Sequence, residues 1–547
     1  MADLLLGPVL RYVGSTQATV WVETDAPCEV AVLDARQPTF SVEGHHFALV
    51  VLSDLEQGAV RPYEVHLDGV QRWPPADGRP PCEIHTREHE RRARLVFGSC
   101  RVGDPERPPY TLSPSEHERA FGVDALWALS RRLQSGVEEW PDCLLLLGDQ
   151  VYADDASEAT SAFIRSRRDT RDPPGEQVAD FEEYTRLYRE AWSDPDVRWL
   201  LATVPSTMIF DDHDVHDDWN ISDAWVREMR ATPWWEERIV GAFMSYWIYQ
   251  HIGNLAPPEL AEERLLAQVR EDEDGGPRLR RFAHAIDRET SSSRFAFHRD
   301  FGRSRLVVVD SRAARVLAGG RRDMVDAEEW EWISEHARGS YDHLIIASTL
   351  PVFMTHSIDS LEAWNEAVCA GAWGRLAARL GEKLRRALDL EHWPAFQRSF
   401  HAMVELLHEL AEGPDAPGTI TFIGGDVHTA YIAEVNLGAR QQSRVFQVVC
   451  SPFRNPLRPR ERRVVKLFGT RPAAWLASAL ARAAGVRRAD VSWRLVTPVT
   501  FQNSVAVLSL DARLARVTIR RSAPEAEDGW PLEMLHEHDL TAAPEPR

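Results

Sequence analysis

Several features that would define other classes of protein are missing from this 547-residue sequence. It contains no run of about eighteen apolar residues, so we expect no helix that crosses a membrane. The opening segment, MADLLLGPVLRYVGS, has neither a basic region before its apolar run nor a twin arginine, which argues against secretion. The six cysteines show no paired spacing, so no disulfide framework is expected. Together these absences predict a cytoplasmic protein.

Positive charge is also in short supply, because the net charge is −21. Nucleic-acid phosphates would be repelled by such a chain, so we expect no nucleic-acid binding. A phosphorylated small molecule is still compatible with the composition. A metal ion at a site can outweigh the charge of a distant acidic surface.

Residues 1–92 alternate apolar and polar residues in short runs that turn residues separate. Examples are ATVWVET, CEVAVLD and FALVVLS. Alternation with a period of two puts the apolar side chains on one face of each strand. These residues therefore predict a small all-β sandwich domain.

From residue 93 the pattern changes to continuous apolar strands that alternate with helical segments. The runs LVFGS, CLLLLGD, LIIAST and ITFIGGD are typical of strands covered on both faces. The helical segment AEEWEWISEHAR follows Asp326, which is placed to cap it. An α/β domain over residues 93–522, with sheet covered by helices, is therefore predicted.

The C-terminal part of the chain has three further predicted features. Residues 456–490 are rich in arginine and alanine and predict a helical insertion. The runs SVAVLSL and ARVTIRR predict two closing strands. Residues 523–547 are polar and contain proline, so they predict a disordered tail.

Four apolar strands end in side chains of the kind that bind metals. Ligands of open α/β sheets gather at the carboxyl ends of strands, so we expect these positions to converge. Cys100 ends the strand LVFGSC, and Asp149 and Tyr152 follow in LLLLGDQVY. The third strand, TMIFDDHD, ends in Asp211, Asp212, His213 and Asp214. The fourth, ITFIGGDVH, ends in Asp426 and His428.

Each of these residues also has an ordinary structural interpretation. Cys100 could be a small buried hydrophobic residue, and Asp149 could form a turn after Gly148. Tyr152 could be a packed aromatic ring, and His428 a histidine of the core. The acidic run could be a solvated loop, although an apolar strand leads into it. The residues taken one at a time leave these alternatives open.

The stretch IFDDHDVHDDWN, residues 209–220, fits neither of two known metal-binding motifs. A calcium loop of EF-hand type needs alternating carboxylates and then a glycine, and His216 and Asp217 break that pattern. A zinc site of the H-E-x-x-H type needs histidines four residues apart, but His213 and His216 are three apart. A carboxylate ligand beside a histidine that acts as acid or base fits the stretch better.

The ordered set GSC, GDQVY, DDHD and GDVH resembles the PhoD-type alkaline phosphatases of the calcineurin-like metallophosphoesterase superfamily. The resemblance covers residues 93–522, and residues 1–92 are similar to the fibronectin-III-like domain that precedes the catalytic part in such enzymes. It implies a two-sheet metallophosphoesterase sandwich flanked by helices. The expected activity is hydrolysis of phosphate esters, as an alkaline phosphatase or phosphodiesterase, by attack of a metal-bound hydroxide.

The resemblance also implies ligands for two or more metal ions, with Fe³⁺ and Ca²⁺ expected and Zn²⁺ or Mn²⁺ as alternatives. Asp149 would bridge two ions. The iron site would be completed by Cys100, Tyr152 and His428. Asp212 and Asp426 would belong to the second site, where carboxylates suit a hard divalent cation.

His213 would stand near the leaving group as the catalytic acid, oriented by Asp211 and Asp214. Arg101 follows Cys100 and is a candidate phosphate contact. Thr349 and Pro351 stand where the family has a metal-binding histidine. No role is assigned to a few nearby residues: His216, Asp217, Asp218 and His356.

Two alternative functions remain open at this point. The first is an enzyme with phosphodiesterase or phospholipase-like specificity. The second is a catalytically silent protein that binds metal and uses its surface for interaction.

Overall fold

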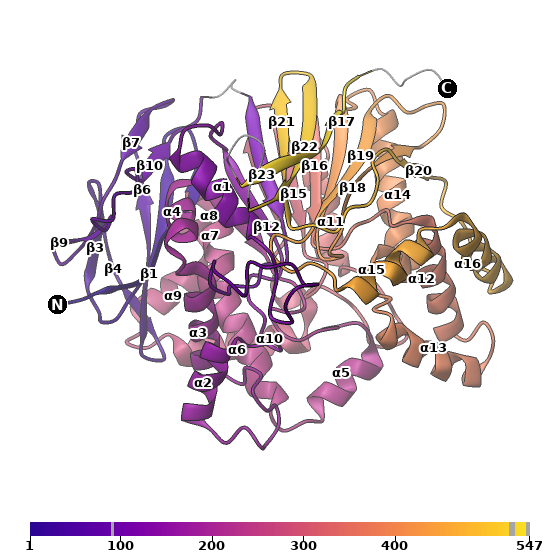
Figure 1. Cartoon of the computed structure of the whole chain (residues 1–547), viewed down its shortest axis with the longest axis horizontal. Coiled ribbons are helices and arrows are strands. Elements are labelled where there is room, and N and C mark those ends of the chain that lie inside the picture. Colours follow the sequence, from indigo (N-terminus) through magenta and orange to yellow (C-terminus); the bar gives the residue numbers. More distant parts are fainter. Residues whose placement is uncertain (89–91, 525–530, 543–547) are drawn as a thin grey trace.

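A computed structural model describes residues 1–88, 92–524 and 531–542. The N-terminal part is built entirely of antiparallel strands, as predicted. One sheet has the order β1(Leu4–Val13), β2(Ala18–Thr24), β6(His45–Leu52), β5(Phe40–Val42). The facing sheet has the order β4(Ala35–Pro38), β3(Glu29–Val32), β8(Val65–Leu67), β9(Val70–Trp73), and β7(Val60–Pro62) pairs with β10(Glu83–His85). This region forms one flank of the molecule in Figure 1.

Two larger mixed sheets follow. The six-stranded sheet has the order β13(Ser206–Ile209), β12(Cys143–Leu147), β11(Ala93–Gly98), β21(Ser504–Asp511), β22(Leu514–Ser522), β23(Leu532–Asp539). The seven-stranded sheet has the order β14(Phe297–Phe301), β15(Ser304–Val309), β16(His343–Ser348), β17(Thr419–Gly424), β19(Arg444–Cys450), β18(Ala430–Asn436), β20(Ser492–Leu495). Side chains from both sheets belong to one buried cluster, so the predicted two-sheet sandwich is confirmed.

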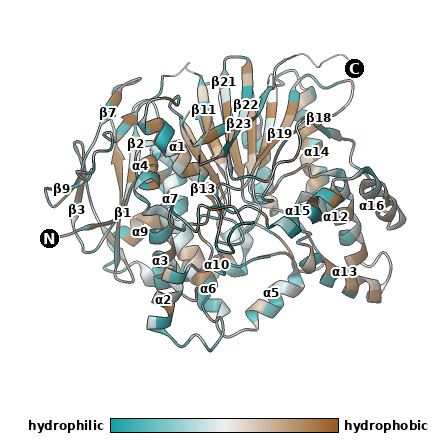
Figure 2. Cartoon of the chain, viewed as in Figure 1, coloured by the Kyte–Doolittle hydropathy of each residue, from teal (hydrophilic) through white to brown (hydrophobic). Residues whose placement is uncertain are grey.

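The central strands of this sandwich are apolar on both faces. All five residues of β12 are buried, as are all six of β16 and of β17. Buried strands of this kind need cover on either side. Figure 2 shows apolar residues gathered in the strands, with polar residues frequent on the surrounding helices.

Helices occupy the connections between strands. They are α1(Ala125–Gln134), α2(Glu158–Arg167), α3(Phe181–Trp192), α4(Pro195–Thr203), α5(Asp223–Arg230), α6(Trp235–Ser245), α7(Ile252–Asn254), α8(Pro257–Glu262), α9(Arg264–Glu271), α10(Gly276–Arg288), α11(Ala327–Ala337), α12(His356–Cys369), α13(Arg375–Ala387), α14(Gln397–Glu412), α15(Pro459–Phe468) and α16(Arg471–Ala483). A π-helical turn joins α6 to α7, and the Asp326 carboxylate caps α11 as expected. Within residues 1–88, 92–524 and 531–542, no helix combines the length and the apolar character needed to span a membrane.

The predicted helical insertion and closing strands are present as α15, α16, β21 and β22. The prediction of a disordered tail from residue 523 was wrong in part, because β23 pairs antiparallel with β22. β23 reads LEMLHEHD and lies at the edge of its sheet, where polar side chains are normal. Composition alone therefore mistook an edge strand for a tail. The rest of that prediction, residues 525–530 and 543–547, lies outside the described residues.

Candidate metal centre

The ends of four strands, β11, β12, β13 and β17, meet in space. β11, β12 and β13 run parallel to one another in one sheet, and β17 runs parallel to β16 and β19 in the other, so the carboxyl ends within each sheet point to the same edge. The ligand atoms of Cys100, Asp149 and Asp426 lie within 4.8 Å of one another. A second group with the same spacing contains four carboxylates: Asp149, Asp211, Asp212 and Asp426. The predicted convergence of these strand ends is present in the fold.

Sharp backbone turns deliver the side chains to this point. Four non-glycine residues adopt left-handed φ angles: 54° at Cys100, 47° at Asp149, 63° at Asp426 and 50° at His428. Such a conformation costs about 1 kcal/mol or more per residue and concentrates at functional sites. Because the left-handed conformation occurs at three of the strand ends, the backbone of this region is strained.

Glycine before two of the acids allows the strand ends to approach closely. A Cβ on Gly148 would lie 2.5 Å from the Cβ and Oδ2 atoms of Asp211. A Cβ on Gly425 would meet the Ser99 hydroxyl, which accepts the backbone N–H of Asp426 at 2.9 Å. Any side chain at either glycine would therefore push the metal-binding positions apart.

The carboxylates are buried with too few partners. Asp149 Oδ1, Asp211 Oδ2 and Asp212 Oδ1 are buried and accept no hydrogen bond. Burial, together with neighbouring acids, raises the pKa of Asp149 well above its usual range and that of Asp211 to about 7. Uncompensated buried charge is expensive, and a bound cation is the usual compensation. The free oxygens of this group therefore fit metal ions.

Cys100 and Tyr152 add softer and more basic donors to one side of the group. The Ser451 hydroxyl donates to Cys100 Sγ at 3.2 Å, and Asn455 donates to the Tyr152 hydroxyl at 3.0 Å. Burial and the nearby acids raise the pKa of both the Cys100 thiol and the Tyr152 hydroxyl. Only a strongly acidic cation would keep both groups as anions. The predicted donor set is thus chemically coherent.

His428 stands beside this group, with its Nδ1–H donated to the Asn455 carbonyl at 2.5 Å. That bond leaves Nε2 as the nitrogen free to bind a ligand. Three groups of side chains with ligand atoms within 4.8 Å of one another are found in the described residues, the third being Asp154, His213 and Asp217, and His428 belongs to none of them. Its expected role as a metal ligand stays a prediction.

His213 is held by an acid that the motif analysis did not select. Asp154 accepts the Nδ1–H of His213, with its two oxygens at 2.9 Å and 3.1 Å, and also the backbone N–H of Asp217 at 2.7 Å. Burial opposes the charged ring, but the Asp154 carboxylate outweighs it and raises the pKa of His213 well above its usual range. The ring also packs on Tyr152 at 4.7 Å between centroids. His213 is therefore an imidazole with a fixed orientation at the edge of the centre.

The prediction that Asp211 and Asp214 orient His213 was wrong. Asp214 accepts the backbone N–H groups of Gln150 and Val151, both at 3.1 Å, so it ties the turn after β12 to the turn after β13. Asp211 pairs instead with Arg312 at 2.5 Å. Both acids support the centre, but through the backbone and through an arginine rather than through His213.

Arg312, in the turn after β15, was also missed. Its guanidinium is fully buried, and its Nη2 lies 3.1 Å from Asp212 Oδ1 and 3.4 Å from Asp426 Oδ2. Its Nη1 lies 2.6 Å from Glu391, and Arg312 and Arg315 outweigh burial to lower the pKa of Glu391 to about 2. Arg312 thus supplies part of the positive charge on the Asp212 side. The available signal was its place at the end of the strand RLVVVDS.

Arg101 does not lie as a phosphate contact should. Its guanidinium pairs with Asp124 at 2.7 Å and also donates to the Ala191 carbonyl. The side chain is buried and already partnered, so the expected phosphate contact is not supported. Its role in the structure is to fix the turn after β11 to α1 and α3.

The residues without an assigned role separate into two kinds. His216 packs among Trp225, Trp234 and Trp235, so it is a structural aromatic residue of the loop. The backbone N–H of Asp218 donates to Asp212 Oδ2 at 3.1 Å, and Asp217 Oδ1 lies 3.8 Å from His213 Nε2. These two contacts link the end of the acidic stretch to the centre.

His356 begins α12, and its ring packs against Trp493 at 4.8 Å between centroids. It is not part of any of the three candidate metal-binding groups found in the described residues. The interpretation of His356 as a structural residue of that helix therefore suits its position.

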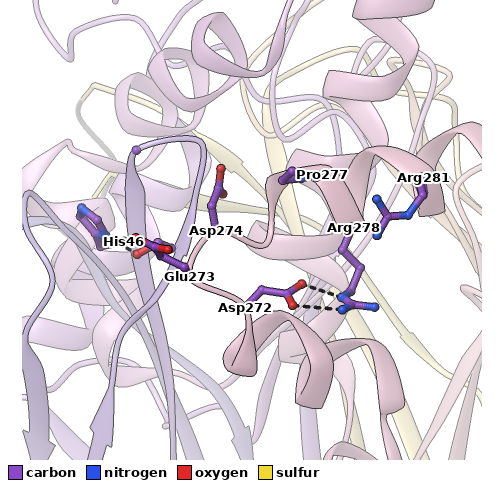
Figure 3. Close-up of a pocket in the computed structure, with 9 residues that line it drawn as sticks. His46, Asp272, Glu273, Asp274, Pro277, Arg278 and Arg281 are labelled. Carbon is purple, nitrogen blue, oxygen red and sulfur yellow. Dashed lines mark hydrogen bonds and ion pairs between the residues drawn. The ribbon is translucent and has the colours of Figure 1, made fainter.

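A cavity of about 680 Å³ opens elsewhere, between the loop that contains Gly44 and the loop that joins α9 to α10. Figure 3 shows its acidic and basic side chains, among which Asp272 pairs with Arg278 at 2.7 Å. It does not contain any of the metal-binding side chains described above. We therefore place the chemistry at the strand ends and not in this cavity.

Comparisons with known proteins bear on the class to which the fold belongs. A model of the PhoD-like phosphatase family matches residues 130–268, which include Asp149, Asp154 and His213. Residues 1–85 match a domain of unknown function, DUF7800. A solved structure titled "Structure of PhoD" superimposes with a TM-score of 0.60 at 12% identity, covering 97% of this chain and 89% of that chain. No curated protein matches the sequence.

The chain shares its two-sheet sandwich fold with the solved PhoD structure. The resemblance predicted from four short motifs is confirmed: residues 130–268 match the PhoD-like phosphatase family, and the fold is shared over nearly the whole chain. These findings support a phosphoesterase.

Proposed function

We propose that this protein hydrolyses phosphate esters at the candidate metal centre. The observation that carries the proposal is the set of buried carboxylate oxygens that accept no hydrogen bond, on Asp149, Asp211 and Asp212, beside an oriented His213. A purely structural cluster would have its acids paired, as buried charges normally are.

The residues divide between two cation positions that share Asp149. One would be formed by Cys100, Tyr152 and His428, whose anionic sulfur and oxygen donors suit Fe³⁺. The other would be formed by Asp212 and Asp426, whose carboxylates suit Ca²⁺. Cations bound there would neutralise the phosphate and supply an activated water molecule as nucleophile.

His213 has the geometry of a general acid. Asp154 accepts its Nδ1–H, so the opposite nitrogen, Nε2, which lies 3.8 Å from Asp217 Oδ1, is the one with a proton to give. The raised pKa of His213 keeps that proton in place near neutral pH. We infer that Nε2 donates it to the oxygen of the departing alcohol, while Asp154 steadies the ring. Arg312 keeps Asp211, Asp212 and Asp426 in position throughout.

The experiment that tests the proposal is elemental analysis of the purified protein, together with its visible spectrum and its turnover of matched phosphate monoesters and diesters. A tyrosinate–ferric absorption band that disappears in Tyr152→Phe would support the iron assignment. A colourless, fully active protein would contradict that assignment but leave a hydrolase.

Relative rates on the monoester and diester decide between phosphatase and phosphodiesterase specificity. Stabilisation by metal ions without turnover of either substrate would instead favour a silent metal-binding protein.

A further inference from the structure

Four helices, α12, α13, α15 and α16, gather at the end of the molecule away from the N-terminal sandwich (Figure 1). This end is unusually apolar at its surface. Eight of the fifteen large apolar side chains that are exposed in the described residues lie here. They are Trp373, Leu376, Leu380, Leu388, Val464, Leu467, Trp475 and Leu476. We call the surface formed by these side chains on α13, α15 and α16 the outer helical surface.

α16 exposes its large side chains and buries its small ones. Its buried residues are Ala477 and Ala481, which face α12, while Trp475 is 69% exposed and Leu476 also faces solvent. A surface helix normally buries its large apolar side chains and exposes polar ones. Contiguous exposed apolar residues of this kind mark interaction sites. The outward face of α16 therefore has the composition of a contact surface.

α13 has the same character. Leu376 and Leu380, 76% and 68% exposed, are four residues apart and lie on one face of the helix. Arg379 and Lys383 fall on that face as well, by the same helical spacing. The indole of Trp373 donates to the Ala483 carbonyl at 3.4 Å, so the start of α13 is attached to the end of α16. The two helices thus belong to one surface.

The charge of this surface is opposite to that of the rest of the chain. Residues 371–388 and 456–488 contain fourteen arginines and lysines against two glutamates, whereas the chain as a whole has a net charge of −21. Within the described residues, several of these basic side chains form neither an ion pair nor a hydrogen bond: Arg375, Arg379, Arg460 and Arg463. The surface is therefore complementary to an anionic partner.

We propose that the outer helical surface binds the anionic surface of a lipid membrane. Exposed tryptophan and leucine between arginines are the composition of helices that lie in the membrane interface, with apolar side chains inserted and cations at the headgroups. Three separate helices share this composition, which suits a broad fluid surface. α15 begins at Pro459, four residues after Asn455, so the bound protein holds the candidate metal centre close to the lipid.

The test is sedimentation of the full chain with vesicles of phosphatidylcholine containing phosphatidylglycerol, and with vesicles of phosphatidylcholine alone. We expect binding to the anionic vesicles that weakens as salt is added. The triple variant Leu376→Ser, Leu380→Ser, Trp475→Ser should bind at least ~10-fold less at the same lipid concentration, because three apolar insertions are lost. A variant Leu514→Ser, Met534→Ser changes two exposed residues outside the outer helical surface and should bind like the parent.

Several results would overturn the proposal. Absence of binding to anionic vesicles is one, and equal loss in the control variant is another. Vesicle binding that survives the triple variant but is lost in Arg379→Gln, Arg463→Gln would show adsorption by charge alone and would overturn insertion of the apolar side chains. A dimer that the triple variant converts to a monomer, without vesicle binding, would identify a second copy of the chain. The single variant Trp475→Ser decides the matter if the triple variant does not fold.

Discussion

The candidate metal centre and the contact between the N-terminal sandwich and the sheets both bury acids, but they treat them differently. At the contact, Glu23 is fully buried and has a partner for each oxygen: His45 at 3.2 Å and Arg189 at 3.3 Å on one, and the Tyr249 hydroxyl at 3.0 Å on the other. At the centre, Asp149 Oδ1 and Asp211 Oδ2 have none, and Asp212 Oδ1 has only the Arg312 guanidinium at 3.1 Å. The same chain therefore satisfies a buried acid where its purpose is structural, and the free oxygens at the centre mark places for cations.

The largest effect that tests this contrast is expected from Asp149→Asn. Asp149 belongs to both groups of metal-binding side chains, so its loss should weaken both cation positions. We expect hydrolysis to fall by at least ~10³-fold and bound metal to be lost, because activation of water depends on the cations. Activity assays with elemental analysis check this. Glu23→Gln, at the structural contact, should retain its metal, and an active Asp149→Asn protein would disprove the assignment.

Arg312→Gln should produce the next largest effect. The substitution leaves Asp211 and Asp212 without their buried cation, while Glu391 keeps Arg315 at 2.9 Å, and breaking such pairs costs about 3–5 kcal/mol. Denaturant unfolding of the metal-free protein would measure the loss. Arg312→Lys, which keeps the charge but not the forked geometry, should recover part of it. If Arg312→Gln unfolds like the parent, the arginine does not compensate these acids.

Metal removal should come third. Ions that bind only the folded state at 100 times their Kd stabilise it by about 2.7 kcal/mol, so a chelator should lower Tm accordingly. Asp149→Asn should no longer respond to the chelator, whereas Glu23→Gln should respond as the parent does. A parent protein with a Tm indifferent to chelation would show that its free oxygens hold no ion.

The smallest effect concerns His45, which joins the sandwich to α3. Burial opposes its charge, but Glu182 at 2.7 Å and Glu23 together raise the pKa of His45 to about 9. Because the folded pKa lies above the unfolded value of about 6.5, this stabilisation is complete below pH 6.5 and is lost as the pH rises toward 9. We expect about 1–2 kcal/mol to disappear over that range. His45→Gln should flatten the dependence in unfolding experiments at pH 6, 7.5 and 9.

The strand ends were predictable from sequence because a continuous apolar run and the residue that follows it are local features. Cys100, Asp149, Asp212 and Asp426 each follow such a run, and parallel pairing brings them to one place. The partners that tune them were not predictable in this way. Arg312 reaches Asp211 across 101 residues, and Asp154 reaches His213 across 59. No periodicity in either segment encodes these contacts.

The same reasoning explains the errors. Asp214 appeared to be the neighbour of His213 because it follows it in sequence, yet its carboxylate points back to the turn at Gln150 and Val151. β23 lacked the apolar alternation of a buried strand because it has only one neighbour, β22, and one exposed edge. Sequence proximity and average polarity therefore predict poorly the contacts that a residue makes with distant parts of the chain.

The close approach at Gly148 has a consequence for which ions the protein accepts. Because a single extra carbon there would collide with the Asp211 side chain, the gap between the ends of β12 and β13 is set by the packing of that side chain on the Gly148 main chain. Strand ends held at a fixed distance cannot move apart for a larger ion or move together around a smaller one. The centre should therefore discriminate among divalent ions by their radius as well as by their chemistry.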